Sequence, residues 1–271
     1  MKSEEQDGIS VRNPEGAGKR QPQSPDEVAV WLCRVQSLVD ADLAIMDRVL
    51  SEDERARRDR FVFAEDRRAF TAAHALLRTV LSRYSSLPPE AWRFETTPHG
   101  KPFLAPAQAG DPPLSFNLSH TRTVVACAVA VEARLGIDVQ ESGRPADVLS
   151  IAERHFTAIE RQLLTGCPRE EVDVRFVEIW TLKEAYVKAV GTGLSLPLDS
   201  FGFSLGDASG LTFDGPADAS RWQFWLAALS STTRIAVAAA VERPDVPWQI
   251  SWWNHDGSPA SGVALLRGNA G

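Results

Sequence analysis

The sequence has only three cysteines among its 271 residues. Cys33, Cys127 and Cys167 lie far apart and form no Cys-x-x-Cys pair, which argues against a disulfide framework and against a thiolate zinc site. An odd number of separated cysteines fits a reducing compartment. We therefore expect a cytoplasmic protein.

Long hydrophobic runs are also absent. The longest apolar stretch, Val124 to Val131, is far shorter than the roughly 20 residues that a membrane-spanning helix needs. The first residues, MKSEEQDGIS, carry acids where a secretory signal has a basic and then an apolar stretch. We expect a protein that is neither exported nor embedded in a membrane.

The chain has no excess of basic residues, because 36 acidic side chains outweigh 29 basic ones and give a formal net charge of -7. A protein that follows the phosphates of a long nucleic acid usually has the opposite balance. We therefore expect no nucleic-acid partner, and any anionic ligand must meet a local basic cluster. The hydrophobic fraction of 44% and the charged fraction of 24% are ordinary for a globular protein.

The order of apolar and polar segments predicts an α+β fold made of two similar halves. FTAAHALLRTVL and FVEIWTLKEAYV echo each other, since each has a Phe followed eight residues later by a charged residue, Arg78 or Glu184. Two short matches of this kind also arise by coincidence. We divide the chain into a polar, flexible tail, an N-terminal half and a C-terminal half, at residues 1–26, 27–135 and 136–271.

Helical spacing of apolar residues predicts two long helices, one from Asp66 to about Ser86 with Asp66 as its cap, and one over 172–190 that ends at Gly191. Shorter helices are expected in the charged segment 50–61 and at about 156–166, where Thr157 and Glu160 form a capping box. Apolar runs predict strands at 28–35, 123–131, 135–140, 201–205, 221–229, 234–241 and 248–253.

The strand at 135–140, LGIDVQ, follows the strand at 123–131 so closely that we expect the two to form a hairpin. Such a pairing places Asp138 in the middle of a sheet. Asp138 and Gln140 are two residues apart on a strand, so their side chains leave the same face. Glu184 and Lys188 are four apart on a helix and share its surface stripe.

Carboxylate and amide oxygens without a neighbouring His or Cys suit a hard cation such as Mg²⁺, which completes its shell with water and substrate phosphate. The substrate would then be a phosphoanhydride. Each pair alone also fits an ordinary role: a Glu/Lys pair at this spacing is most often an exposed salt bridge. An Asp in a strand is usually at an edge or a turn, and the run Arg55 to Arg60 is more often an exposed helix face.

The sequence around these residues resembles the surfactin-synthetase (Sfp) type of 4′-phosphopantetheinyl transferase. The resemblance rests on LSFNLSHT, LGIDVQ and WTLKEAYVKAVGTGLSLPLDSF in this order and spacing, and it covers roughly residues 28–240. It implies two similar α/β halves related by a pseudo-two-fold axis, with a ligand cleft between them. Because both halves are in one chain, it also implies a monomer.

The resemblance implies that the protein transfers 4′-phosphopantetheine from coenzyme A to a serine of an apo carrier protein, with Mg²⁺, and releases 3′,5′-adenosine diphosphate. The carrier would serve polyketide, nonribosomal peptide or fatty acid synthesis. By position in the motifs, it implies as catalytic residues Glu184, Lys188 and His120, and as metal ligands Asp138, Gln140 and Glu184. It implies contacts with coenzyme A by Arg57, Gly100, Lys101, Asn117, Ser119, His120, Asp138 and Lys188.

Two departures from the family pattern concern the ligand. Gln140 stands where many members have a second acid, and Glu54 stands where the best-known member has a lysine. The contact with the 3′-phosphate then falls to Arg57 or to one of the neighbouring arginines, which are Arg55, Arg58 and Arg68.

Outside the resemblance, His120 also fits a buried structural histidine and Lys101 an ordinary surface lysine. Two other functions stay open. A non-catalytic protein that binds coenzyme A or a carrier would keep the cleft without turnover, and Gln140 favours it. A metal-dependent phosphohydrolase would explain the acids, but not HGKP, NLSH and KEAYVK together.

Overall fold

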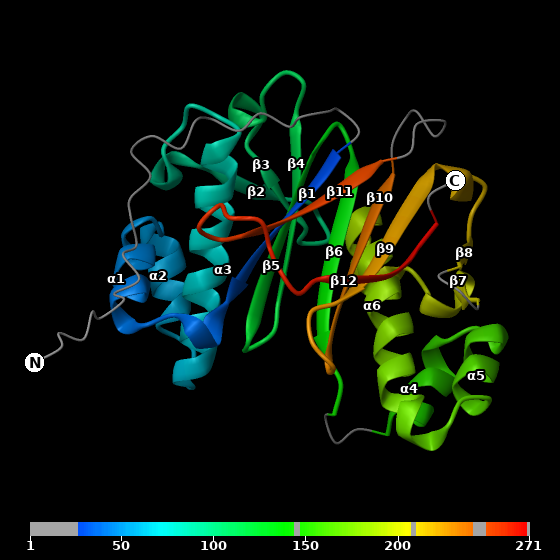
Figure 1. The fold of residues 1–271 in the computed structure, drawn as a ribbon. Coiled ribbons are helices and arrows are strands. Elements are labelled where there is room, and N and C mark those ends of the chain that lie inside the picture. Colours follow the sequence, from blue (N-terminus) through cyan, green and yellow to red (C-terminus); the bar gives the residue numbers. More distant parts are fainter. Residues whose placement is uncertain (1–26, 144–146, 207–209, 241–247, 270–271) are drawn as a thin grey trace, which may run out of the picture.

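The computed structural model describes residues 27–143, 147–206, 210–240 and 248–269, and it has a mixed α+β fold (Figure 1). The expected tail at 1–26 lies outside the described residues. The helices are α1 (Asp40–Arg48), α2 (Glu52–Arg58), α3 (Ala64–Arg83), α4 (Val148–His155), α5 (Ala158–Thr165) and α6 (Val172–Val190). None of the helices in the described ranges is long and apolar enough to cross a membrane.

Within the described residues, the strands form two large sheets and two short hairpins. The first sheet has the order β11-β1-β5-β4 and the second has the order β12-β9-β10-β6. The strands of the large sheets are β1 (Glu27–Arg34), β4 (Leu114–His120), β5 (Val124–Val131), β6 (Arg134–Glu141), β9 (Trp222–Ala228), β10 (Thr233–Ala240), β11 (Gln249–Asn254) and β12 (Ala264–Gly268). The short hairpins are β2 (Phe94–Thr96) with β3 (Pro102–Leu104) and β7 (Gly202–Leu205) with β8 (Leu211–Asp214).

The molecule is layered, with α3 and α6 on opposite outer sides of the two sheets (Figure 1). Leu77 and Val80 of α3 pack on the outer face of the first sheet, together with Trp31. Tyr186 of α6 lies in an aromatic cluster on the outer face of the second sheet, against Trp222 and other rings. The inner faces of both sheets share a third core.

The central strands β5 and β10 are buried at every residue. A strand covered on both faces needs apolar side chains in both directions, which explains the uninterrupted apolar runs VVACAVAV in β5 and IAVAAA in β10. The predicted strands and both long helices are confirmed in position.

The predicted hairpin of 123–131 with 135–140 is wrong. β5 is hydrogen-bonded to β1 on one edge and to β4 on the other, so it has no free edge for β6. The link between β5 and β6 instead leads into the second sheet, where, among the strands that the structure describes, β6 lies at the edge and pairs with β10 alone. Asp138 therefore lies in the middle of an edge strand and not in the middle of a sheet.

The capping predictions have mixed outcomes. Thr157 and Glu160 form the expected capping box, and Gly191 ends α6 in the left-handed conformation with φ 81°. The start of α3 was placed too late, because the helix begins at Ala64 after Phe63. Asp66 lies in its first turn and pairs with Arg122 instead of capping it. β4 was not among the predicted strands, although the apolar–polar alternation in LSFNLSH is typical of a strand.

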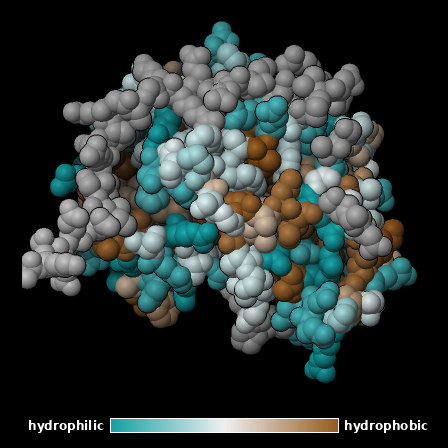
Figure 2. Space-filling model, in the orientation of Figure 1, coloured by the Kyte–Doolittle hydropathy of each residue, from teal (hydrophilic) through white to brown (hydrophobic). Residues whose placement is uncertain are grey.

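The Trp-rich C-terminal segment closes the inner core. β11 runs parallel to β1, so this late segment belongs by its hydrogen bonds to the first sheet. Trp248, Ile250 and Trp252 pack against the shared core. In the space-filling view, hydrophobic residues gather near the middle of the face, over β11 and β12 (Figure 2).

Candidate active site

The two sheets meet where β4 lies beside the outer edge of β6. The Ile137 backbone N–H donates to Asn117 Oδ1 over 2.9 Å, and the Val139 N–H donates to Ser119 Oγ over 3.3 Å. These two side chains give the edge of β6 the hydrogen bonds that another strand would supply. They hold Asp138, which lies between Ile137 and Val139, at the boundary of the two sheets.

A glycine on β6 allows α6 to approach this boundary. A Cβ added to Gly136 would lie 2.0 Å from the carbonyl oxygen of Ala185 and 2.5 Å from the backbone nitrogen of Ala189. The absence of a side chain therefore lets helix and strand touch, and it brings Glu184 and Lys188 close to Asp138. Gly136 was not among the predicted site residues, although a glycine inside an apolar strand is a known signal of close backbone approach.

Asp138 is buried, with 3% of its side chain exposed, and three side chains donate hydrogen bonds to it. Lys188 Nζ reaches Oδ1 at 2.6 Å, and Ser119 Oγ reaches the same oxygen at 2.9 Å. Gln140 Nε2 reaches Oδ2 at 3.1 Å, which confirms that Asp138 and Gln140 share a face. Lys188 Nζ also donates to Ser119 Oγ at 3.0 Å.

Glu184 is different, because its half-buried carboxylate has no hydrogen bond or ion pair with any residue that the structure describes. Burial raises its pKa, the negative charge of Asp138 raises it further, and Lys188 opposes both effects. The carboxylates of Asp138 and Glu184 thus lie near each other where α6 meets the sheets, and the amine of Lys188 lies beside them. This arrangement favours a bound cation or a shared proton.

A cavity of about 280 Å³ opens beside these groups. Its lining includes five residues named from the sequence, which are Gly100, Lys101, Asn117, Glu184 and Lys188. The remaining lining residues are His99, Pro102, Leu118, Val187, Gly191 and Gly193. Ser119 and Asp138 lie directly behind this wall, because both accept hydrogen bonds from Lys188.

Lys101 lines the cavity, yet its amine is bonded to the protein backbone. Nζ donates to the carbonyl oxygens of Ala189 at 2.9 Å and Leu135 at 3.1 Å, at the end of α6 and the start of β6. Burial, with a smaller effect of Arg134, lowers the pKa of Lys101 to about 8. The side chain also packs on Gly191, whose added Cβ would lie 3.1 Å from the Lys101 Cδ. Lys101 therefore ties the β2–β3 hairpin to both elements of the site.

Neither His120 nor Arg57 lines the cavity. His120 is the last residue of β4, and part of its side chain is exposed. Partial burial of the ring lowers the pKa of His120, a hydrogen bond with the Thr121 backbone opposes this effect, and the positive charge of Lys188 adds to it. The ring is thus neutral at neutral pH. Arg57 is exposed on α2, with its guanidinium carbon 5.8 Å from the centre of the Phe70 ring, and it does not line the cavity.

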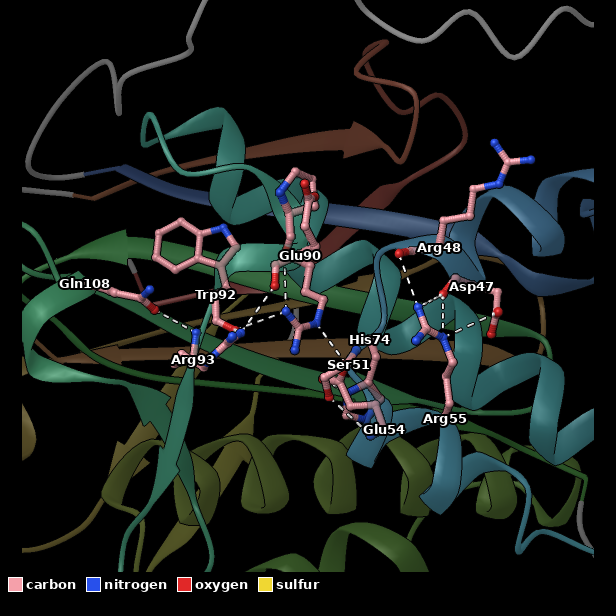
Figure 3. A network of polar contacts seen from close by, with 12 residues as sticks. Asp47, Arg48, Ser51, Glu54, Arg55, His74, Glu90, Trp92, Arg93 and Gln108 are labelled. Carbon is pink, nitrogen blue, oxygen red and sulfur yellow. Dashed lines mark hydrogen bonds and ion pairs between the residues drawn. The ribbon is translucent and has the colours of Figure 1, made fainter.

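The residues around Glu54 form a closed network (Figure 3). Glu54 contacts His74 Nδ1 at 2.9 Å, Arg78 Nε at 2.9 Å and the Ser51 backbone N–H at 2.8 Å. Burial opposes its ionisation, but the hydrogen bonds from His74, Arg78 and Ser51 outweigh burial and lower the pKa of Glu54 to about 2. Glu54 is therefore a structural carboxylate.

The alternative arginines are occupied as well. Arg55 donates to the carbonyl oxygens of Asp47 and Arg48 (Figure 3). Arg58 pairs with Asp47 and Asp59, and Arg68 pairs with Asp40 at 3.0 Å and donates to the carbonyl of Leu38. Each of these arginines would have to exchange a protein partner for a ligand phosphate.

The oxygen set at the boundary fits Mg²⁺. Within the described ranges, no group of three or more His, Cys, Asp and Glu residues could hold a metal ion. Mg²⁺ needs fewer, since it is usually bound by one or two carboxylates together with substrate phosphates. Asp138 and the unpartnered Glu184 supply two carboxylates, and the amide of Gln140 lies next to them.

Comparison with protein families gives two matches in one chain. Residues 134–240 match the 4′-phosphopantetheinyl transferase superfamily, and residues 38–132 match 4′-phosphopantetheinyl transferase, N-terminal. The chain is similar to 4′-phosphopantetheinyl transferase HetI of Nostoc sp., with 38% identity over 172 residues, 63% of this chain and 71% of that protein. It is also similar to 4′-phosphopantetheinyl transferase Sfp of Bacillus subtilis (strain 168), with 31% identity over 78% of this chain and 96% of that protein.

Among solved structures, the chain is similar to a holo-(acyl-carrier-protein) synthase from Bacillus anthracis str. Ames in complex with CoA (3′,5′-ADP). The identity is 24%, the match covers 39% of this chain and 93% of that chain, and the TM-score is 0.34.

Proposed function

The chain belongs to the 4′-phosphopantetheinyl transferase superfamily, and we propose that it transfers 4′-phosphopantetheine from coenzyme A to a serine of an apo carrier protein. The observation that carries this proposal is the arrangement of Asp138, Glu184 and Lys188 beside the cavity. Two carboxylates and one amine at a cavity wall are the groups that binding and activating a diphosphate requires.

In this proposal Asp138 and Glu184 hold Mg²⁺, and the Gln140 amide supports them with one charge fewer than a second acid would. When bound, Mg²⁺ neutralises charge on the diphosphate and orients its oxygens. Burial raises the pKa of Glu184, which makes its carboxylate a better proton acceptor than an ordinary glutamate, so Glu184 takes the proton of the carrier serine. Asp138 is held in place by three hydrogen bonds.

The serine oxygen forms a bond to the β-phosphorus of coenzyme A as the bond to the bridging oxygen breaks. Lys188 and His120 then face the charge that gathers on the departing 3′,5′-adenosine diphosphate. Lys188 is positioned for this by Ser119 and Asp138. His120 is neutral in the free protein, so a bound phosphate is expected to raise its pKa and protonate it.

Coenzyme A would lie in the cavity against Gly100, Lys101 and Asn117, with its diphosphate at Glu184 and Lys188. Ser119 acts on the ligand through Lys188, and Arg57 is the proposed contact for the 3′-phosphate. Lys101 acts mainly by fixing the cavity wall, since its amine is bonded to two backbone carbonyls.

We also propose that the halves 27–135 and 136–271 are related by a pseudo-two-fold axis and act as a monomer. In support, each large sheet is covered by one long helix, although β11 returns from the second half to the first sheet. The three free cysteines support a reducing, cytoplasmic location.

The experiment that tests the function is incubation with coenzyme A, Mg²⁺ and an apo carrier protein, followed by mass measurement of the carrier. The proposal expects a mass gain of one phosphopantetheine group and release of 3′,5′-adenosine diphosphate. Binding of coenzyme A without a mass gain would favour a non-catalytic binder. Loss of coenzyme A with an unchanged carrier would favour a phosphohydrolase.

A further inference from the structure

Three consecutive apolar residues are exposed in the turn between α2 and α3. The exposed fractions are 36% for Phe61, 82% for Val62 and 59% for Phe63. Single apolar residues on a surface are ordinary, but an exposed run of them indicates an interaction site. We call Phe61 to Phe63 the 61–63 turn.

The turn is held in a fixed shape by its neighbours. Arg67 donates from one guanidinium nitrogen to the carbonyl oxygens of Phe61 at 2.7 Å and Val62 at 3.1 Å. The Phe61 ring packs at 5.5 Å from the Phe70 ring, and the Arg122 guanidinium lies 5.5 Å from the centre of the Phe63 ring. A preformed apolar surface loses little conformational entropy when it binds a partner.

The charge around the turn is opposite to that of the whole chain. Residues 57–68 hold five arginines and three acids, whereas the chain carries a net charge of -7. Arg57 and Arg60 are exposed and form no ion pair within the described part of the chain. A partner that fits this surface presents apolar side chains next to acidic ones.

The turn lies close to the proposed site. Arg122, which contacts Phe63, follows His120 by two residues, and two extended residues span at most about 7 Å. Arg122 also lines a groove of about 710 Å³ that extends to Glu141, the residue after Gln140 on β6. The groove therefore runs from Arg122, which contacts the turn, to Glu141 at the end of β6.

We infer that the 61–63 turn, with Arg60 and Arg122, is a docking surface for the carrier protein, which binds through a segment bearing apolar and acidic side chains. This inference rests on the proposed function and names its partner surface. Docking here brings the carrier next to His120 at the end of β4, the strand that also carries Ser119 and Asn117.

The test is steady-state transfer by the full-length protein, with the apo carrier that the wild type modifies fastest. Val62→Asp and Phe63→Asp replace exposed side chains, so both variants should keep the wild-type melting temperature. The KM for the carrier should rise about tenfold or more, as for a hot-spot residue, while the KM for coenzyme A stays unchanged. Leu265→Asp is the matched control, because Leu265 is 55% exposed on β12.

A charge series gives an independent readout. Arg60→Glu should raise the KM for the carrier and weaken its dependence on salt, because rim charges act mainly through electrostatic attraction. Arg169→Glu reverses the charge of an exposed arginine outside the 61–63 turn, and it should leave the KM for the carrier and its salt dependence unchanged. An unchanged KM for the carrier in Val62→Asp, Phe63→Asp and Arg60→Glu would overturn the inference.

Two other outcomes are decisive. A change in sedimentation coefficient of Val62→Asp at unchanged carrier KM would assign the turn to a second copy of this chain and overturn the inference. If the wild type modifies no carrier, the proposed function fails. The affinity of the carrier for the wild type and for Phe63→Asp is then measured directly. Equal affinities would overturn the docking surface, and a lower affinity of the variant would support it.

Discussion

The long helices α3 and α6 each cover one large sheet, but they use their charged side chains differently. On α3, Arg78 has 3% of its side chain exposed and donates to Glu54 and to the carbonyl oxygens of Pro89 and Trp92. On α6, Glu184 has no partner in the described structure and faces Asp138 and Lys188. Charges whose hydrogen bonds are complete hold a fold together, whereas charges left incomplete mark a place for a ligand.

The same contrast exists within α6. Lys183 is fully buried, and its amine donates to the carbonyl oxygens of Leu198 and Phe201 at 2.7 Å and pairs with Glu160 at 2.9 Å. Lys188 has 29% of its side chain exposed and lines the cavity. The segment WTLKEAYVK thus combines one lysine that anchors the helix and one that faces the proposed ligand.

The largest expected effect comes from changing Glu184, the charged residue without a hydrogen-bond partner in the described structure. Glu184→Gln should lower kcat about 10²- to 10⁴-fold, because it removes a negative charge and the proposed base without changing side-chain volume. The melting temperature should stay the same, since Glu184 has no partner among the described residues. Transfer kinetics and a thermal scan check both parts, and activity within a few-fold of wild type would remove Glu184 from the mechanism.

The next effect is on the contact that brings α6 to β6. Gly136→Ala puts a Cβ where the Ala185 carbonyl oxygen lies 2.0 Å away, so the helix must move. We expect a loss of about 1–3 kcal/mol in the free energy of unfolding and a lower kcat. Gly268→Ala is the control, since a Cβ added there would lie at an ordinary 3.5 Å from the Phe224 carbonyl oxygen, and urea unfolding should separate the two variants. Equal stability and activity in both variants would contradict the close approach.

Changing Glu54, whose hydrogen bonds are complete, should lower the stability of the fold and leave the transfer reaction unaffected. Glu54→Gln leaves Arg78 buried without its counter-charge, so we expect a loss of about 2–4 kcal/mol in unfolding free energy with kcat nearly unchanged. The pKa of Glu54 is lowered from 4.5 to about 2, so its contribution is fully present above pH 4.5 and is lost as the pH falls towards 2. The stability difference between wild type and variant should shrink over that window, and a constant difference would contradict the assignment.

The smallest effect concerns Lys101, which lines the cavity like Glu184 but has its hydrogen bonds complete like Glu54. Lys101→Met keeps the packing on Gly191 but removes two hydrogen bonds, so we expect a loss of about 1–2 kcal/mol in stability. Because the cavity wall loosens, the KM for coenzyme A should rise more than kcat falls. A depressed kcat at unchanged KM would instead give Lys101 a role in the chemical step.

The sequence predicted the features that depend on local spacing. The capping box at Thr157, the end of α6 at Gly191 and the shared face of Asp138 with Gln140 follow from neighbouring residues, and the structure has them. Recognition of the motifs also named the family.

One local prediction failed, because Asp66 pairs with Arg122 instead of capping α3. The other features that failed depend on residues far apart in the chain. β6 pairs with β10 about a hundred residues later, and β11 joins β1 across most of the sequence. No local pattern specifies such partners. Glu54 looked like a gap in a phosphate site because the sequence does not show that His74 and Arg78 surround it.

The most direct test is calorimetric titration of Mg²⁺ into the wild type, Glu184→Gln and Glu54→Gln, each with and without coenzyme A. The wild type and Glu54→Gln should bind Mg²⁺ weakly alone and clearly more tightly with coenzyme A, since binding linkage is reciprocal. Glu184→Gln should lose most of this binding while keeping its fold. Equal Mg²⁺ affinity in the wild type and Glu184→Gln would contradict the assignment of the open carboxylate on α6 to the metal.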